Sequence, residues 1–210
     1  MSDAEPTTAS PPGQITVQAQ MAFCTPLIAG MLEDADAFNA ELRQKILALR
    51  ESSPGVQRGN VGGWHSESDL LQKLGEPFAG SLGRMFLQLI QSAMQAVKAP
   101  IEAQGNQRVE AWATVNEKGN SHRPHIHPGC PWSGVYYVAT DPGKHGELRF
   151  TDPRPAALMI HHALAPWNQL NQVRIDPKPG MMVVFPSFLY HAVENYAGDA
   201  LRISISMNLR

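Results

Sequence analysis

The chain has 210 residues, of which 43% are hydrophobic and 17% charged, so it can bury one sizeable core and is too apolar to be disordered. Its formal net charge of -2 and pI of about 6.4 exclude a basic field for nucleic acid or an anionic membrane, and its apolar runs are too short to span a bilayer. Two cysteines make no disulfide framework, and the N-terminus lacks the features of a secretory signal, so we expect a cytoplasmic protein.

The N-terminal half is predicted to contain a flexible tail over residues 1–13, a strand over 14–23 and three helices. Asp34 or Asp36 is expected to cap the first helix, which ends near residue 50, and Ser68 is expected to cap the second, which covers 69–74. The third begins at Pro77 and ends near residue 98. Apolar residues recur at helical spacing in the first and third helices. We therefore expect these helices to pack against a sheet.

From residue 108 onward, short extended runs alternate with turn residues. The eight expected strands are 109–116, 121–127, 134–140, 147–151, 172–176, 181–185, 191–195 and 201–208. Eight antiparallel strands behind two to three helices indicate a mainly β fold, a jelly-roll barrel or double-stranded β-helix. We expect a single domain over 14–210, with helical support over 34–100, a barrel core over 108–210, and a polar lid insert over 155–171.

Three histidines can meet in this architecture. His125 and His127 lie at i and i+2 of an expected strand, so their side chains point the same way. His191 opens a later strand, and the second and seventh strands of a jelly roll lie side by side. Imidazoles suit iron, copper, zinc and nickel, and three of them leave positions open for other ligands. The sequence thus predicts a metal site, and the alternative is that His125 and His127 are surface or turn histidines.

The spacing of these histidines resembles the cupin family. The positions that fit its two motifs, G-x5-H-x-H and G-x5-P-x-G-x2-H-x3-N, are Gly119, His125, His127, Gly180, Pro186, His191 and Asn195. Two positions depart from the pattern. The glutamate expected after H-x-H falls on Pro131 or Trp132, and the inner glycine of the second motif is Phe188. A cupin would therefore lack one metal ligand here.

The same residues resemble the Fe(II)/2-oxoglutarate dioxygenase superfamily. Its signature is H-x-D/E, a distal histidine, and a basic residue about ten positions later that binds the far carboxylate of the cosubstrate. Arg202 lies eleven residues beyond His191, and Ser204 follows on the same face of the strand. A guanidinium and a hydroxyl suit a buried carboxylate, whereas Arg202 without a dicarboxylate would be an unpaired buried charge.

Further segments are similar to a bacterial group of 2-oxoglutarate/Fe(II) oxygenases, and the resemblance covers roughly residues 23–208. The segments are 23–26, 62–66, 133–138, 146–154, 185–187 and 202–208. The resemblance implies a jelly-roll fold, Fe(II) as cofactor and 2-oxoglutarate as cosubstrate. It also implies that Arg202 and Ser204 bind the distal carboxylate of 2-oxoglutarate.

One position departs from that superfamily, because His127 stands where a carboxylate is usual. Three neutral histidines leave an Fe(II) site at a net charge of +2 instead of +1. Three alternatives stay open. His127 points away from the metal, a carboxylate such as Glu147 or Asp152 approaches from another strand, or His122 competes as a ligand.

Other residues are candidates for the pocket. Trp64 and His65 either line the substrate pocket or anchor a glycine-rich loop, and Arg154 either grips an anionic substrate or braces the lid through Asp152. Tyr136 and Tyr137 lie on opposite strand faces, so only one faces the barrel. Tyr137 is a candidate cosubstrate contact or a packing residue, and Asn116 is a candidate cosubstrate contact or a turn residue. Cys130 is a candidate site of oxidation, and His161 and His162 are expected to be solvated in the lid.

These observations predict a 2-oxoglutarate-dependent dioxygenase that hydroxylates an unidentified substrate and releases succinate and CO2. The expected partners are O2 and a small-molecule or side-chain substrate, without nucleic acid or membrane. The sequence leaves the oligomeric state open, with a homodimer among the alternatives. The rival function is a cupin-type three-histidine metalloenzyme, a dioxygenase or isomerase, that does not use 2-oxoglutarate. A non-enzymatic sensor or carbohydrate-binding module is a third alternative.

Overall fold

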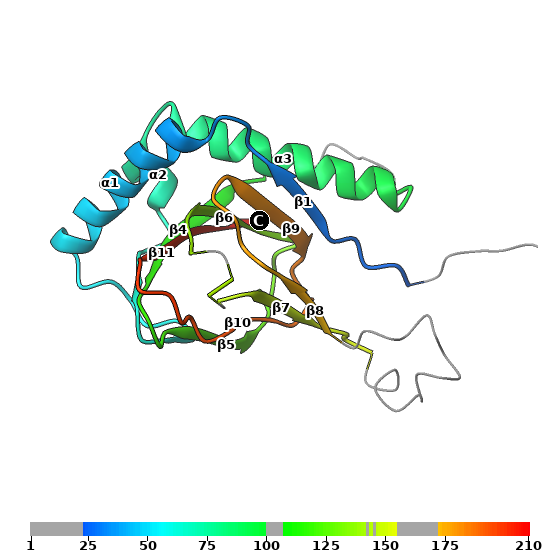
Figure 1. The fold of residues 1–210 in the computed structure, drawn as a ribbon. Helices are drawn as coiled ribbons and strands as arrows, with labels where there is room; N and C mark the ends of the chain where they lie inside the picture. Colours follow the sequence, from blue (N-terminus) through cyan, green and yellow to red (C-terminus); the bar gives the residue numbers. More distant parts are fainter. Residues whose placement is uncertain (1–22, 100–106, 142, 145, 155–171) are drawn as a thin grey trace, which may run out of the picture.

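Two antiparallel sheets lie one above the other, and helices cover the outer face of the larger sheet (Figure 1). The structure is a computed structural model and describes residues 23–99, 107–141, 143–144, 146–154 and 172–210. The helices are α1 (Asp36–Ser52), α2 (Leu70–Leu74) and α3 (Phe78–Ala96). The strands are β1 (Ile28–Met31), β2 (Asn60–Val61), β3 (Trp64–His65), β4 (Val109–Asn116), β5 (Ser121–His125), β6 (Trp132–Ala139), β7 (Leu148–Thr151), β8 (Gln172–Ile175), β9 (Met181–Pro186), β10 (His191–Val193) and β11 (Arg202–Leu209).

The larger sheet has the strand order β1-β9-β6-β11-β4-β3, and the smaller sheet has the order β2-β5-β10-β7-β8. Neighbouring strands often come from distant parts of the sequence. In the smaller sheet, β10 pairs with both β5 and β7, and in the larger one β11 pairs with both β4 and β6. This arrangement is a jelly roll, as expected. Within the described residues the strands form two separate sheets and not one closed barrel.

Alternation along β11 separates the two faces of the larger sheet. Ile203, Ile205 and Met207 belong to the core between this sheet and the helices. The residues between them face the space between the two sheets, and this second set is Arg202, Ser204, Ser206 and Asn208. Because side chains alternate across a strand, one strand supplies both the hydrophobic core and the polar wall of an internal cavity.

The helices form where the apolar spacing predicted them. Leu42 and Ile46 of α1, and Leu82 and Phe86 of α3, are buried against the sheet. The predicted capping is wrong. Helix α1 has Ala35 at its N-cap position, and neither α1 nor α2 has a capping hydrogen bond from a side chain. These helices are therefore stabilised by packing of their apolar stripes against the sheet, without a side-chain capping hydrogen bond at their N-termini.

The eight strands expected after residue 108 are all present, with boundaries shifted by a few residues. Strands β1, β2 and β3 were not expected. The predicted tail over 1–13 and lid over 155–171, with His161 and His162, lie outside the described residues, as does the predicted strand over 14–23 except for Phe23. Phe23 has a φ of 58° and does not belong to a strand.

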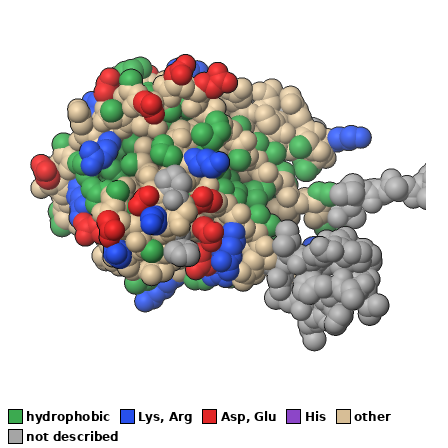
Figure 2. Space-filling view, in the orientation of Figure 1, with side chains coloured by type: hydrophobic (Ala, Val, Ile, Leu, Met, Phe, Trp, Pro, Cys, Tyr) green, Lys and Arg blue, Asp and Glu red, His purple; other side chains and the backbone are tan. Residues whose placement is uncertain are grey.

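The surface carries acidic and basic side chains interspersed over the face shown in Figure 2, with hydrophobic side chains between them. Cys24 and Cys130 are free thiols. Among the helices that the structure describes, none combines the length and apolarity needed to cross a membrane.

Candidate functional site

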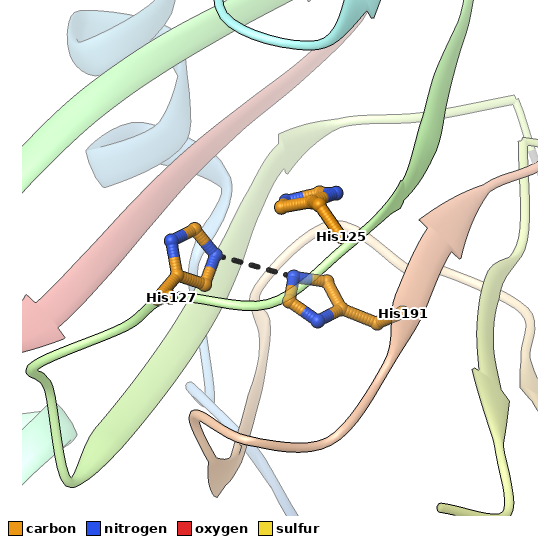
Figure 3. A group of neighbouring side chains, drawn as sticks. All are labelled: His125, His127 and His191. Carbon is orange, nitrogen blue, oxygen red and sulfur yellow. Dashed lines mark hydrogen bonds between the residues drawn. The ribbon is translucent and has the colours of Figure 1, made fainter.

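Three histidines meet between the two sheets, and Figure 3 shows their rings facing a common space. His125 ends β5, His191 begins β10, and the two residues are direct partners in the antiparallel pairing of these strands. His127 lies two residues past the end of β5, so the predicted strand to residue 127 is too long. One potential ligand atom from each of the three side chains lies within 4.8 Å of the others.

The distances fit a shared cation. His127 Nε2 and His191 Nε2 are 3.2 Å apart. Two imidazole nitrogens at about 2.1 Å from one cation lie roughly 3 Å apart when they meet it at a right angle. No carboxylate joins this cluster among the described residues. The donor set available to a metal is therefore three imidazoles.

Backbone carbonyl groups orient two of the rings. His125 Nδ1 lies 2.7 Å from the carbonyl oxygen of Arg123, and His191 Nδ1 lies 2.9 Å from that of Leu189. A carbonyl can only accept, so each ring carries its proton on Nδ1 and leaves Nε2 free. This is the usual arrangement of a histidine that binds metal through Nε2.

Burial keeps the three imidazoles neutral. It lowers the pKa of His191 to about 3 and that of His127 to about 4, and the neighbouring histidines lower both further. Burial also lowers the pKa of His125. Neutral imidazole is the form that binds metal. The cluster is therefore ready to accept a cation at neutral pH without losing protons.

A cavity of about 280 Å³ extends from the histidines between the sheets, and Arg202 contributes to its wall. The guanidinium is buried, with 1% of the residue exposed. Arg202 Nε donates to the carbonyl oxygen of Gly146 at 3.2 Å, and Nη1 donates to Ser204 Oγ at 3.4 Å. The guanidinium carbon lies 5.2 Å from the ring centroid of Tyr137. Within the described residues no carboxylate pairs with Arg202, and burial lowers the pKa of its guanidinium.

Two polar side chains near Arg202 are also buried without partners. The hydroxyl of Tyr137 lies close to the guanidinium without a well-formed hydrogen bond, and both amide atoms of Asn116 are unpartnered among the described residues. Asn116 faces Arg202 directly across β4 and β11. An unsatisfied buried polar group destabilises a fold by roughly 1–3 kcal/mol. An unsatisfied hydroxyl beside an unpaired buried cation indicates a site for an anion, whereas Asn116 does not line the cavity.

Of the other predicted pocket residues, His65 and Tyr137 line the cavity, whereas Trp64 and Tyr136 face the helices. Trp64 Nε1 donates to the carbonyl oxygen of Ser53, so this indole anchors the glycine-rich loop. Tyr136 donates to Asn39 Oδ1. In each pair of adjacent residues, Trp64 with His65 and Tyr136 with Tyr137, one side chain faces the cavity and the other faces the helices, because neighbouring residues of a strand point to opposite faces.

The remaining candidates lie apart from the three-histidine cluster. Arg154 and Asp152 form an ion pair with each other outside the cavity, and Glu147 pairs with Arg174. His122 lines the cavity beside His125 but is not part of the cluster, and burial lowers its pKa to about 3. Cys130 is half-buried, and burial raises the pKa of its thiol.

Trp112 and Asn208 are among the cavity residues that were not predicted from the sequence. Trp112 stacks on His65 with ring centroids 5.8 Å apart and lies 5.5 Å from the ring of His127. Asn208 lies beside His127 on the inner face of β11. Alternation along β4 and β11 could have found both, because Trp112 shares the face of Asn116 and Asn208 shares the face of Arg202 and Ser204.

Residues 110–208 match the family model described as "Putative 2OG-Fe(II) oxygenase". No curated protein sequence matches the chain significantly. Among solved structures, the chain is similar to a prolyl-4-hydroxylase from Pseudomonas putida, at 18% identity and a TM-score of 0.58, over 89% of this chain and 92% of that one.

Two other solved structures are also similar. The α-ketoglutarate-dependent carbocyclase SnoK from nogalamycin biosynthesis has 15% identity and a TM-score of 0.59, over 88% of this chain and 79% of that one. HygX from Streptomyces hygroscopicus, solved with nickel and 2-oxoglutarate bound, has 12% identity and a TM-score of 0.56, over 88% of this chain and 82% of that one. Likeness at these identities shows a common fold.

Proposed function

Residues 110–208 of the chain belong to the 2OG-Fe(II) oxygenase family, and from this premise we propose that the three-histidine cluster and Arg202 jointly hold Fe(II) and 2-oxoglutarate for hydroxylation of a C–H bond. The chain is a 2-oxoglutarate-dependent oxygenase, an oxidoreductase whose family implies O2 and a small-molecule or peptide substrate. The substrate is unidentified. Release of succinate and CO2 accompanies the proposed hydroxylation.

The observation that carries the proposal is the buried Arg202 in the same cavity as His125, His127 and His191. An unpaired charge is expensive to bury, so a fold that keeps one has a use for it. Beside Arg202 lie the unpartnered hydroxyl of Tyr137 and the hydroxyl of Ser204, and Asn116 occupies the strand position opposite Arg202. A carboxylate has enough acceptor positions for an arginine and further donors.

The charges of the site support a dianion. Fe(II) contributes +2, Arg202 contributes +1, and the neutral histidines contribute nothing, so 2-oxoglutarate leaves a net charge of +1. Burial raises the pKa of Tyr137 to about 12, and its hydroxyl therefore keeps a proton to donate to a carboxylate oxygen. His122 stays neutral and adds no competing charge.

Fe(II), when bound, supplies the oxidising chemistry by coupling O2 reduction to the decarboxylation of 2-oxoglutarate. The protein's own contribution is to orient the reactants and exclude water. Val135, Leu148 and Phe185 give the cavity an apolar wall, and the ring of Phe185 lies 4.7 Å from that of His191. Arg202 on one side and the histidines on the other hold the two ends of a short diacid.

Anaerobic titration tests this assignment. Fe(II) is added first and 2-oxoglutarate second, and the visible charge-transfer absorption of the chelate is followed. We expect the band in the wild-type protein and its loss in Arg202→Met, which still binds the metal. Arg154→Met is the matched control, because Arg154 is exposed and paired with Asp152 outside the cavity. This control should titrate like the wild type.

Two results would contradict the proposal. Metal binding in the wild type without any chelate band would favour the cupin-type alternative, which the three-histidine donor set also suits. Equal 2-oxoglutarate affinity in wild type and Arg202→Met would remove Arg202 from the cosubstrate site.

A further inference from the structure

His127 differs from the other two histidines in how its ring is held. It lies in the loop beyond β5, whereas His125 and His191 lie on paired strands. The backbone N–H of His127 donates to the carbonyl oxygen of Ser187 at 3.1 Å. Its ring Nδ1 faces a side chain and not a carbonyl group, with Asn208 Nδ2 at 3.4 Å. The orientation of this ring therefore depends on Asn208.

Asn208 belongs to a buried chain of hydrogen bonds. Ser133 Oγ donates to Asn208 Oδ1 at 2.8 Å, and Ser133 Oγ lies 2.7 Å from Ser187 Oγ. The three residues are buried, with at most 3% exposed. Asn208 and Ser133 face each other directly across β11 and β6. Ser187 connects this chain of hydrogen bonds back to His127, because its backbone carbonyl accepts from the N–H of His127.

The contacts of His127 indicate which ring nitrogen carries its proton in this arrangement. His191 uses its Nδ1–H on the carbonyl of Leu189, so its Nε2 must be the acceptor in the 3.2 Å contact with His127 Nε2. His127 therefore carries its proton on Nε2, and its Nδ1 accepts from the amide nitrogen of Asn208. This is the wrong tautomer for binding a metal through Nε2.

The chain of hydrogen bonds can be reversed without changing any charge. If the amide of Asn208 turns over, its oxygen accepts a hydrogen bond from His127 Nδ1–H and its nitrogen donates to Ser133 Oγ. Ser133 can then donate to Ser187, because a hydroxyl is both donor and acceptor. His127 Nε2 becomes free. An amide and hydroxyls support both tautomers, whereas a backbone carbonyl supports only one.

We propose that Asn208 is a positioning residue for His127, and that turnover of its amide selects the tautomer in which His127 binds metal through Nε2. This inference rests on the metal site of the proposed function. It assigns to Asn208, Ser133 and Ser187 the outer support that a metal ligand needs. It also explains how a histidine on a loop can fill the position of the usual carboxylate.

Metal affinity of the metal-free protein tests the inference without any turnover. Ni(II) is titrated by calorimetry into wild type, Asn208→Ala and Asn208→Asp. Loss of outer support costs metal ligands about 10–100-fold in affinity, so we expect Asn208→Ala to weaken binding within that range. Asn208→Asp should keep wild-type affinity or exceed it, because a carboxylate always accepts from Nδ1–H. Thermal unfolding checks that each variant folds.

A double-mutant cycle separates positioning from general structure. In a His127→Ala background, Asn208→Ala should have less than about a twofold further effect, because its partner is gone. Long-range 1H–15N spectra of the wild type supply a second readout. We expect the proton of His127 on Nε2 before addition of Zn(II) and on Nδ1 after it.

Three results would overturn the inference. The first is that Asn208→Ala binds Ni(II) as tightly as the wild type. The second is that Asn208→Ala weakens Ni(II) binding as much in the His127→Ala background as in the wild type. The third is that the tautomer of His127 does not change when metal is added. Failure of the wild-type protein to bind Ni(II) is a separate result, since it would remove the metal site of the proposed function and this inference with it.

Discussion

At the scale of single residues, Arg202 combines burial, a positive charge and a lack of carboxylate partners within the described residues. Its partners are the carbonyl oxygen of Gly146, the hydroxyl of Ser204 and the ring of Tyr137. These uncharged partners offset part of the cost of burying the guanidinium but do not neutralise its charge. The residue that is proposed to bind cosubstrate is therefore also a residue that destabilises the fold in the absence of an anion.

This conflict predicts that Arg202→Met stabilises the protein. Replacing a buried charge by an apolar side chain of similar length should raise the free energy of unfolding by roughly 1–3 kcal/mol. Chemical denaturation in the absence of 2-oxoglutarate measures it. Saturating concentrations of 2-oxoglutarate and metal should reduce or reverse the difference in free energy of unfolding between the two proteins, because only the wild type binds the cosubstrate. Lower stability of Arg202→Met without ligands would mean that the charge is balanced within the fold.

Alternation along strands made several of these residues predictable. It placed Arg202 and Ser204 on one face, and it required that only one of Tyr136 and Tyr137 face the cavity. Hydrogen-bond partners were not predictable in the same way. Asn208 shares the face of Arg202, but its role depends on the loop that carries His127 and on Ser133 of another strand. Those contacts join segments that are far apart in the sequence.

At the scale of elements, close contact between α3 and the larger sheet requires a glycine in β6. A Cβ added to Gly134 would lie 2.7 Å from the ring of Phe86 and 3.2 Å from the carbonyl oxygen of Val183. Phe86 is fully buried, so the ring has little room to move. The helix can lie this close to the sheet because residue 134 has no side chain.

Gly134→Ala should therefore lower the free energy of unfolding by about 1–3 kcal/mol, the usual effect of overpacking a core. Gly83→Ala, in α3, is the matched control. A Cβ there would meet nothing within 4 Å, and alanine should stabilise the helix by up to about 1 kcal/mol. Urea denaturation of both variants measures the difference. Equal effects of the two substitutions would show that the contact with Phe86 does not limit the packing.

The elements themselves were largely predictable, and their ends were not. Helical spacing found α1 and α3, and turn residues found the strands from β4 to β11. Strand β1 was missed because it is a four-residue strand at the edge of a sheet, where only its pairing with β9 defines it. Strand β5 ends before His127 because the N–H of that residue binds Ser187, a contact with a distant loop.

At the scale of the whole molecule, the pairing of β5 with β10 brings His125 beside His191. The sequence predicted this juxtaposition only through the jelly-roll architecture, since the two residues are far apart in the chain. The two sheets then enclose the histidines and Arg202 in one cavity. Enclosure has a consequence for the global stability of the protein, because it buries several imidazoles in neutral form.

Stability of the metal-free protein should fall as the pH drops below about 6.5. Burial lowers the pKa of His191 to about 3 in the folded state, whereas the ordinary pKa of a histidine is 6.5. Between these two values the unfolded chain binds the proton and the folded chain does not. The stabilising contribution of His191 is thus complete above pH 6.5 and is lost progressively toward pH 3, with a slope that approaches about 1.4 kcal/mol per pH unit.

Urea denaturation from pH 7.5 to 5, in the presence of a chelator, measures this slope. His191→Gln is the matched variant, because its amide does not titrate, and its stability should depend less on pH than that of the wild type. A wild-type stability that stays level or rises between pH 6.5 and 5 would contradict the neutral burial of the cluster.

In the proposed function, one cavity holds the metal on three histidines and 2-oxoglutarate on Arg202. Anomalous diffraction at the iron edge, from crystals grown without oxygen with Fe(II) and 2-oxoglutarate, tests it most directly. We expect one iron peak bound by Nε2 of His125, His127 and His191, with the distal carboxylate of 2-oxoglutarate on the guanidinium of Arg202. An iron bound by a side-chain carboxylate in place of His127, or a 2-oxoglutarate that does not contact Arg202, would contradict it.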